Sequence, residues 1–313
     1  MPRLAEGVCS KLTSAVIARC KTSKIFTVDD FIFQDPESLS KDISTPYKDV
    51  LLIRDALLLK FAPVLRRADS LLCEVLDTLA IFETGSKRIN NALQGGVYTG
   101  EVTEIHGPPG SGKTQFCLDV ISNLLIETSC TVLYMDSNCT FSAGRVEEIL
   151  LQKSDGCTVL NEKLQRIKVI NMYDVYNFLD ILYYVEKELQ KKENFYYKNL
   201  KLVIIDSITH ILAPCFGGSF LDGGGMISIV SELFNIICSK YTLSIMVCNN
   251  TVQSNGFIIK PALGASWKHV PSVSLCIQNI SDTERRKLSA VKSCRTGLFK
   301  DVPFCIGKCG ISN

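Results

Sequence analysis

Apolar runs of strand length alternate with amphipathic segments of helix length through the middle of this chain. The strand-like segments cover residues 102–105, 131–136, 166–170, 202–206 and 243–248, and the one at 202–206 is apolar up to its closing acid. Apolar residues recur with helical spacing over 142–153, 173–191 and 225–240. Strands that are apolar throughout and separated by helices indicate a parallel sheet that is covered on both faces.

The pattern changes after residue 270, where the helical segments stop. Short strand-like segments joined by turns follow at 272–278, 287–293 and 302–306. Strands joined by short turns must run antiparallel, so we expect an antiparallel extension along one edge of the sheet. The fold class predicted for 83–313 is therefore α/β, with a mostly parallel sheet and an antiparallel C-terminal edge.

The first 60 residues contain helix signals and no strand signal. Thr13 can cap a first helix, and Thr27 with Asp30 three residues later resembles a capping box. Asp35-Pro36 and Thr45-Pro46 each offer an N-cap followed by proline at the first helical position. A last helix at about 46–60 repeats apolar residues along one face, at Val50, Ile53, Leu57 and Phe61. We expect a small α-helical domain over 1–60, which either docks a partner or DNA or serves as a structural cap.

Residues 61–82 have the features of a linker between this domain and a core at 83–313. Phe61-Ala62-Pro63 interrupts the helical pattern, and an apolar segment follows at 71–79. An exposed apolar linker is a candidate contact for a partner protein. The same segment could equally pack back on its own core.

The loop that follows the 102–105 strand carries the most specific motif in the chain. Residues 107–114 read G-x-x-x-x-G-K-T, the P-loop or Walker A pattern, between a strand and a helix that opens at Gly112. Glycines let backbone N–H groups turn inward around phosphate oxygens, at the positive end of the helix dipole. Lys113 would neutralise phosphate charge, and the Thr114 hydroxyl would ligate Mg²⁺. The residues expected to bind ATP are Gly107, Pro108, Pro109, Gly110, Ser111, Gly112, Lys113, Thr114 and Gln115.

Asp206 ends the apolar run at 202–206, about 90 residues after the phosphate loop. An acid at the carboxyl end of a strand beside the P-loop strand is the Walker B position. There it would hold the Mg²⁺ water shell opposite Thr114. The sequence thus predicts a site for ATP and Mg²⁺, with Lys113 and Asp206 as its charged members.

Composition limits the binding partners and the cellular compartment that this protein can have. The net charge is only +2, yet residues 253–313 carry nine Lys or Arg against three Asp or Glu. That basic segment could meet nucleic-acid phosphate or could be ordinary solvated surface. Fourteen cysteines without a C-x-x-C pair predict a reducing compartment, without a zinc site or a disulfide framework. No apolar run approaches the length of a membrane span, so we expect a cytosolic or nuclear protein and no membrane contact.

The motifs, taken in order, resemble those of the RecA-type recombinases. A GG-x-x-x-G-x-x-x-E sequence leads into the P-loop within 85–115. Further landmarks of the same core are YMDSNCTF (134–141), LVIIDS (202–207), VCNN (247–250) and KPALGASW (260–267). The short N-terminal helical domain, the brief 251–262 segment and the KPALG-x-SW signature are most similar to the D-type class of eukaryotic recombinase paralogs.

The resemblance implies a RecA-like P-loop ATPase core in a recombinase-paralog complex that binds ATP and Mg²⁺. Such complexes bind single-stranded DNA and assist recombinase filament assembly in homologous-recombination repair and fork protection. The implied partners are a C-type paralog at the N-terminal domain and linker, an XRCC-type paralog at the ATPase core, and a B-type paralog in the same complex. The implied location is the nucleus, with a cytosolic pool.

Several positions depart from the family pattern. Asn138 stands where active members have a Glu that orients the attacking water, and Asn cannot accept a proton. Because a positioned general base contributes about 10²–10⁴-fold, we expect slow or absent hydrolysis and an adaptor stabilised by nucleotide. The alternative is a DNA-stimulated ATPase that remodels filaments and uses another carboxylate, such as Glu104. Arg145 matches the adenine-stacking position, and Asn250 replaces a γ-phosphate-sensing Gln, which puts coupling to the next loop in doubt.

The DNA-binding loops implied by the family are also altered. The first, at 213–225, contains no Lys or Arg, and the second, at 251–262, offers one Lys. Strand exchange by this chain alone is therefore not expected. Candidate DNA contacts are Lys260, Lys268 and the basic turn Arg285, Arg286 and Lys287. By resemblance, Lys292 and Arg295 could reach the nucleotide of a neighbouring subunit, although a basic strand edge explains them equally well.

Overall fold

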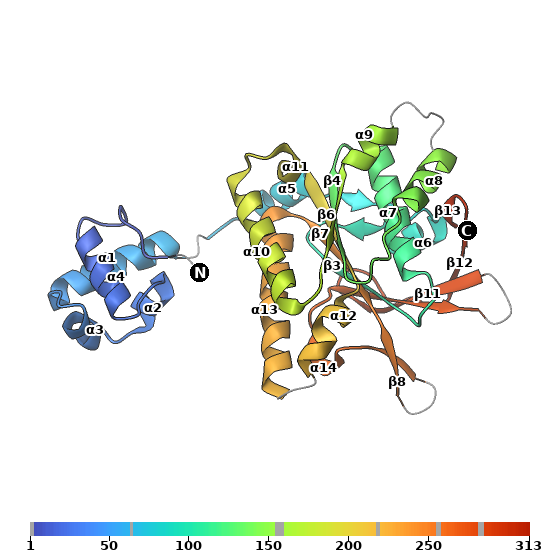
Figure 1. The fold of residues 1–313 in the computed structure, drawn as a ribbon. Helices are drawn as coiled ribbons and strands as arrows, with labels where there is room; N and C mark the ends of the chain where they lie inside the picture. The colour runs from blue at the N-terminus through green and yellow to red at the C-terminus, as the bar shows by residue number, and fades with distance from the viewer. Residues whose placement is uncertain (1–2, 63–64, 154–159, 217–219, 255–257, 281–284) are drawn as a thin grey trace. The chain divides into compact units, whose positions relative to one another are not determined.

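The computed structural model shows two compact units (Figure 1). It describes residues 3–62, 65–153, 160–216, 220–254, 258–280 and 285–313. Met1–Glu74 forms the first unit and Val75–Asn313 the second. Each unit has its own cluster of buried hydrophobic side chains, and the two are described separately below.

The first unit is built from short helices, as the sequence predicts. These are α1 (Ser14–Thr22), α2 (Val28–Phe33), α3 (Pro36–Asp42) and α4 (Tyr47–Phe61). The capping box of α2 is confirmed: the Thr27 hydroxyl accepts from the Asp30 N–H at 3.1 Å, and the Asp30 carboxylate accepts from the Thr27 N–H at 2.9 Å. Asp35 caps α3 in the same way, with Pro36 as the first helical residue. Local side-chain chemistry therefore sets these helix starts.

Two expectations for α4 are wrong. Its N-cap is Pro46, and the Thr45 hydroxyl instead donates to the carbonyl of Ile43 at 3.1 Å. Phe61 is 42% exposed, because it is the last residue of α4 and lies one turn beyond the packed part of the helix. The core face of α4 is formed by Val50, Ile53 and Leu57.

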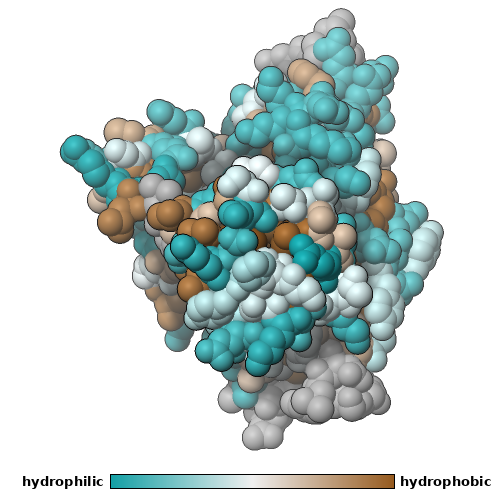
Figure 2. Space-filling view, turned by 90° about the vertical axis from the view of Figure 1, so that its left-hand side faces the viewer, coloured by the Kyte–Doolittle hydropathy of each residue, from teal (hydrophilic) through white to brown (hydrophobic). Residues whose placement is uncertain are grey.

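A helix lies inside the segment predicted as a linker. This helix, α5 (Ala68–Thr78), buries none of its residues. Its apolar side chains are between 38% and 63% exposed, at Leu71, Leu72, Val75 and Leu76. On the face of the molecule drawn in Figure 2, hydrophobic residues lie in separate groups among hydrophilic ones.

The second unit is organised around a nine-stranded sheet with the order β13-β12-β11-β10-β3-β7-β6-β4-β5. The strands are β3 (Val102–His106), β4 (Thr131–Asp136), β5 (Ile167–Asn171), β6 (Leu200–Asp206), β7 (Ser244–Asn249), β10 (Val273–Asn279), β11 (Arg285–Ser293), β12 (Val302–Gly307) and β13 (Gly310–Ser312). Pairing is parallel from β5 to β10 and antiparallel from β10 to β13. The predicted parallel sheet with an antiparallel edge is thus confirmed.

Helices cover both faces of this sheet (Figure 1). On one face lie α7 (Lys113–Glu127) and α8 (Ala143–Lys153), and on the other lie α10 (Val175–Lys191) and α13 (Phe220–Tyr241). Successive residues of β6 point to opposite faces of the sheet. Ile204 belongs to the hydrophobic cluster that includes residues of α7, and Ile205 belongs to the cluster that includes residues of α10. This two-sided burial explains why the central strands β6 and β7 are mostly apolar.

The remaining elements are short. They are β1 (Ile81–Phe82), β2 (Val97–Tyr98), β8 (Thr251–Ser254), β9 (Ile258–Pro261), α6 (Lys87–Ala92), α9 (Leu160–Gln165), α11 (Phe195–Lys198), α12 (Ile208–Leu212), α14 (Gly264–Trp267) and the 3₁₀ helix η2 (Ala213–Phe216). Within the described ranges, no helix has the length and apolar character needed to cross a bilayer.

The structure corrects the two segments expected to be DNA-binding loops. In the first, Ala213–Phe216 forms η2 and the glycines at 223–225 lie inside α13, while 217–219 fall outside the described residues. The Phe216 ring packs on Gly223, where an added Cβ would lie 2.7 Å from the ring. This tertiary contact favours the helix against the low helix propensity of glycine. The second segment forms an antiparallel hairpin of β8 and β9, with 255–257 outside the described residues.

A buried ion pair lies between α7 and α8. The Asp119 carboxylate is fully buried and accepts from Lys153 Nζ at 2.8 Å. The backbones of Gly85 and Gly310 pack directly on this carboxylate, where an added Cβ would lie 1.9 Å and 1.7 Å from its two oxygens. Asp119 therefore joins α7 to both the start of this unit and the β12–β13 turn.

Candidate functional site

The phosphate loop predicted from the sequence joins β3 to α7. Gly110 and Gly112 have φ angles of +73° and +103°, a region that residues with a Cβ rarely adopt. At Gly107 a Cβ would lie 2.4 Å from the carbonyl oxygen of Ile277, so the backbone there requires glycine for close packing. Gly112 is the N-cap of α7. The loop thus has the tight backbone and the helix N-terminus that phosphate binding requires.

The Lys113 ammonium and the Ser111 hydroxyl lie at this loop. Lys113 Nζ donates to the carbonyls of Gly107 at 2.8 Å and Pro108 at 3.2 Å. Burial lowers the pKa of the Lys113 ammonium, while nearby Cys248 and Asp206 act in the opposite direction. The Ser111 hydroxyl is buried and has no hydrogen-bond partner among the described residues. A bound phosphate would supply acceptors for both groups.

Asp206 lies directly beside the start of α7. The Thr114 hydroxyl donates to Asp206 Oδ2 at 2.6 Å, and the Tyr134 hydroxyl donates to the same oxygen at 2.9 Å. Asp206 is only 4% exposed at the end of β6. Burial, followed by the charge of Asp206, raises the pKa of the Tyr134 phenol. No sequence motif indicates Tyr134, because it occupies an ordinary apolar position of β4.

These residues fit a magnesium nucleotide. Mg²⁺ prefers oxygen ligands and keeps several of its waters. The Thr114 hydroxyl and the Asp206 carboxylate present oxygens 2.6 Å apart beside the loop. Lys113 and the N-terminus of α7 provide positive charge for phosphate oxygens. When bound, the nucleotide would supply the negative charge that this cluster lacks.

Asn138 follows β4 and contacts a residue that the sequence did not indicate. Its Oδ1 atom accepts a hydrogen bond from Nδ1 of His210, which lies on α12. The turn after β4 is fixed by the Asp136 carboxylate, which accepts from the N–H groups of Asn138 at 3.0 Å and Phe141 at 2.8 Å. The approach of His210 depends on the path of the chain after β6, so no local motif could have indicated it.

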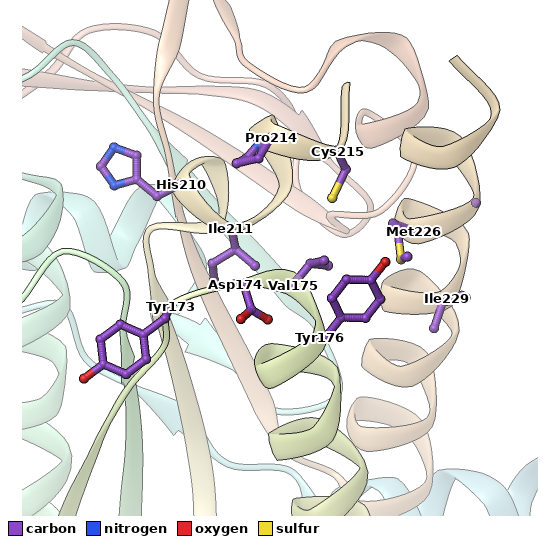
Figure 3. A pocket seen from close by; sticks show the side chains of 11 residues that line it. Tyr173, Asp174, Val175, Tyr176, His210, Ile211, Pro214, Cys215, Met226 and Ile229 are labelled. Atoms are coloured by element: carbon purple, nitrogen blue, oxygen red, sulfur yellow. The ribbon is translucent and has the colours of Figure 1, made fainter. Parts of the chain in front are cut away.

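A pocket of about 720 Å³ opens next to His210 (Figure 3). Tyr173 and Tyr176 line it and are 82% and 67% exposed. The His210 ring lies at the edge of the pocket and points away from Met226 on α13 (Figure 3). Aromatic faces can stack on bases, but the described residues that line this pocket include no Lys or Arg to contact phosphates.

Glu104 does not fit the alternative role of activating water. It is 2% exposed within β3, and both carboxylate oxygens accept hydrogen bonds. Its donors are Asn249 Nδ2 at 2.8 Å, Trp267 Nε1 at 2.7 Å and Ser274 Oγ at 2.5 Å. A buried carboxylate that already accepts three hydrogen bonds on the face opposite α7 is poorly placed to take a proton from water.

Arg145 lies close to the phosphate loop helix. Its Nε donates to Gln115 Oε1 at 2.9 Å, and its other nitrogens donate to Glu148 and to the carbonyls of Gly307 and Lys308. The structure therefore brings together two residues predicted to bind the nucleotide, Arg145 and Gln115, beside the β12–β13 turn.

The candidate DNA contacts lie on β9, the end of α14 and β11. Residues 285–287 begin β11 and are not a turn, which corrects the expectation. Arg286 packs against the phosphate loop, since a Cβ at Gly112 would lie 3.3 Å from its Nε. Lys287 forms an ion pair with Asp301 at 2.9 Å. Lys260 and Lys268 are exposed.

Arg295 is engaged within its own chain. Its guanidinium donates to Glu101 Oε2 at 2.9 Å and to the Gly96 carbonyl at 2.8 Å, and it lies 3.8 Å above the Tyr98 ring centroid. A trans role would require all of these contacts to break. Lys292 Nζ donates to the Lys268 carbonyl at 2.8 Å, a single contact that it could exchange more easily.

Comparison with known proteins places these features in a family. Residues 1–60 match the family described as RAD51D, N-terminal domain, and residues 76–271 match the family described as Rad51. DNA repair protein RAD51 homolog 4 of Mus musculus is 33% identical over 88% of this chain and 84% of its own length. The Bos taurus protein of the same name is 31% identical over 88% and 85%, respectively. DNA repair protein RAD51 homolog 2 of Homo sapiens is 24% identical over 90% of this chain and 82% of its own.

Proposed function

Because this chain belongs to the Rad51 family, we propose that it is an ATP-binding subunit of a recombinase-paralog complex that acts in recombination repair. The contact between Thr114 and Asp206 beside an intact phosphate loop carries this proposal. It joins the two groups that would share Mg²⁺ beside the phosphate loop. Assistance to recombinase filaments on single-stranded DNA and protection of stalled forks, in the nucleus and with a cytosolic pool, are the finer parts of the same proposal.

The subunit acts mainly as an adaptor that nucleotide stabilises. Asn138 provides no carboxylate to take a proton from the attacking water, so ATP stays bound for longer. Bound ATP stabilises the folded second unit because the unfolded chain has no site for it. At a ligand concentration one hundred times Kd, this linkage contributes about 2.7 kcal/mol.

The experiment is thermal unfolding of the full chain with and without ATP and Mg²⁺. We expect ATP to raise the melting temperature of the parent and of the exposed-surface control Lys300→Ala. The Lys113→Ala variant should lose this shift, because its loop lacks the ammonium that neutralises phosphate. An equal ATP-induced shift in Lys113→Ala would refute the nucleotide site.

Assembly with other recombinase paralogs is the second part of the proposal. The apolar side chains of α5, including Leu72 and Leu76, are exposed and would be buried by a partner. We expect the C-type paralog at the first unit and linker, the XRCC-type paralog at the second unit, and the B-type paralog in the same complex. Co-purification of Leu72→Asp should lose one paralog and keep the other, and the identity of the lost paralog decides the assignment. Retention of every partner would show that α5 is not a contact.

The alternative function, DNA-stimulated ATP hydrolysis, is favoured by one observation. His210 contacts Asn138 through Nδ1, which places an imidazole, a common general base, beside the position of the family Glu. Single-turnover hydrolysis with and without single-stranded DNA tests this function. If DNA increases turnover and both Lys113→Ala and His210→Ala abolish it, the result supports the enzyme function. Tight ATP binding with negligible turnover supports the adaptor function.

A further inference from the structure

The hydroxyl of Tyr134 on β4 contacts the acid that ends β6. It donates to Asp206 Oδ2 at 2.9 Å, and Thr114 Oγ1 donates to the same oxygen at 2.6 Å. A phenol is protonated at neutral pH and an ionised carboxylate only accepts hydrogen bonds, so Tyr134 is the donor. In the described part of the chain, both donors approach Oδ2 and none approaches Oδ1. They therefore fix the orientation of the carboxylate and leave Oδ1 available to another donor, such as a metal-bound water.

The register of the sheet explains how a tyrosine reaches this acid. β4 and β6 are parallel neighbours, and Tyr134 lies opposite Ile204. Asp206 lies two residues beyond Ile204, on the same face of the sheet, because successive side chains of a strand alternate between faces. Two residues advance the strand by about 7 Å, a distance that a phenol spans and a serine or threonine side chain does not. The contact therefore depends on a long side chain at this position of β4.

Packing holds the Tyr134 ring in place independently of this hydrogen bond. The side chain is fully buried, and the centroid of its ring lies 4.8 Å from that of Phe141. Phe141 is itself fixed, since its N–H donates to the Asp136 carboxylate at 2.8 Å. A buried tyrosine hydroxyl usually requires a hydrogen-bond partner, and Asp206 supplies one. The ring therefore presents its hydroxyl to Asp206 from a fixed position.

We propose that Tyr134 is a positioning residue for Asp206 and keeps its carboxylate oriented toward the water shell of Mg²⁺. This role deepens the proposed function and rests on the nucleotide site proposed there. Thr114 is an expected ligand of Mg²⁺, so its hydroxyl has to serve both the metal and Asp206, whereas Tyr134 serves Asp206 alone. Loss of a hydrogen-bond partner of a metal-binding carboxylate weakens metal binding about 10–100-fold. Because Asp206 would contact Mg²⁺ through water, we expect the lower end, about tenfold.

The experiment measures how strongly Mg²⁺ increases the affinity of the full chain for ATP. Calorimetry gives the Kd of ATP in excess EDTA and in excess Mg²⁺, and the ratio of these two values is the contribution of the metal. Tyr134→Phe keeps the ring and removes the hydroxyl. It should bind ATP in EDTA as the parent does, and its ratio should fall about tenfold. Thr114 still donates to Asp206 Oδ2 in this variant, so no buried acceptor loses its last donor and the fold should persist.

The matched control is Tyr196→Phe. Tyr196 is also buried and its hydroxyl also donates to β4, to the carbonyl of Val132 at 2.5 Å, but it packs in the hydrophobic cluster on the opposite face of the sheet. Loss of this hydroxyl should leave the ratio unchanged. Asp206→Asn gives a second test, because the phenol acts only through the carboxylate. In the Asp206→Asn background, Tyr134→Phe should not lower the ratio further.

The outcomes separate the positioning role from the nucleotide site. An unchanged ratio in Tyr134→Phe overturns the positioning role and leaves the site intact. An equal loss of ATP affinity in EDTA and in Mg²⁺ also overturns it, because that is the result of a merely structural role. A parent that binds ATP without any gain from Mg²⁺ overturns it as well. A parent that binds no ATP in either solution overturns the proposed function together with the positioning role.

Discussion

Replacement of Lys153 by methionine would leave the carboxylate of Asp119 buried without its partner. Lys153 Nζ lies 2.8 Å from Asp119 Oδ1, and the side chains are 18% and 0% exposed. Removal of one member of a buried ion pair costs about 3–5 kcal/mol. Because Lys153 retains some contact with solvent, we expect the lower end, about 3 kcal/mol. For a unit of this size, 1 kcal/mol corresponds to about 2–4 °C, so the melting temperature should fall by about 6–12 °C.

Guanidinium unfolding followed by Trp267 emission is the appropriate assay. The single tryptophan lies in the second unit, so the transition reports the unit that contains the ion pair. The exposed-site control Lys187→Met should stay within about 0.5 kcal/mol of the parent. The double variant Lys153→Met with Asp119→Asn should be more stable than Lys153→Met alone, because the neutral amide needs no counter-charge.

The pH dependence of this variant has a defined sign. Burial raises the pKa of Asp119 above its ordinary value of 3.8, and Lys153 opposes that rise. Without Lys153 the pKa rises further, so the native state holds its proton to higher pH than the unfolded chain. The stability deficit of Lys153→Met should therefore grow as pH rises through the raised native pKa of Asp119 and shrink as pH falls below it. A deficit below about 1 kcal/mol at neutral pH, or a double variant no more stable than the single one, would refute the reasoning.

Three further predictions follow from named contacts. Gly112→Ala should abolish the ATP-induced shift in melting temperature and destabilise by about 1–3 kcal/mol, because its φ angle is +103° and its Cβ would lie 2.4 Å from Ile306 Cδ1. Arg295→Ala should destabilise the second unit in guanidinium unfolding, yet leave nucleotide-dependent assembly unchanged if its contacts are only internal; loss of assembly in a stably folded variant would support the trans role. The unfolded chain protonates His106 more readily than the native state does, so parent stability should fall as pH drops through about 6.5, and His106→Phe should flatten that slope.

The phosphate loop and the helix caps could be predicted because their chemistry is local. Residues 107–114 fix their own backbone through glycine and their ligand through one lysine and one hydroxyl. Thr27 and Asp30 satisfy each other within one turn. The alternation of apolar runs and amphipathic helices was likewise sufficient for the sheet, because burial on both faces leaves a direct pattern in the strands.

Features that depend on distant parts of the chain were not accessible in this way. Tyr134 and Asp206 meet across adjacent strands, 72 positions apart. His210 reaches Asn138 across the same number of positions, and Arg286 reaches the phosphate loop from β11. The helix at 68–78 is a different case, because Leu71, Leu72, Val75 and Leu76 recur with helical spacing and this local signal was interpreted only as an apolar linker segment. The contacts of Tyr134, His210 and Arg286 are decided by tertiary placement and leave no periodic signal.

The order of strands in the sheet has a consequence for the synthesis of the protein. The strand that bears the phosphate loop, β3, pairs with β7 and β10. Val102 pairs with Ile245 and Thr103 pairs with Val273, and both partners are synthesised much later than β3. At ribosomal elongation rates of about 5–20 residues per second, the first of these partners follows about 7–30 s later. Throughout that interval β3 is a strand with two open edges, a feature that favours aggregation of nascent chains. A product truncated before residue 244 would retain the phosphate loop and lack both neighbours of its strand, so it should require chaperone binding to remain soluble.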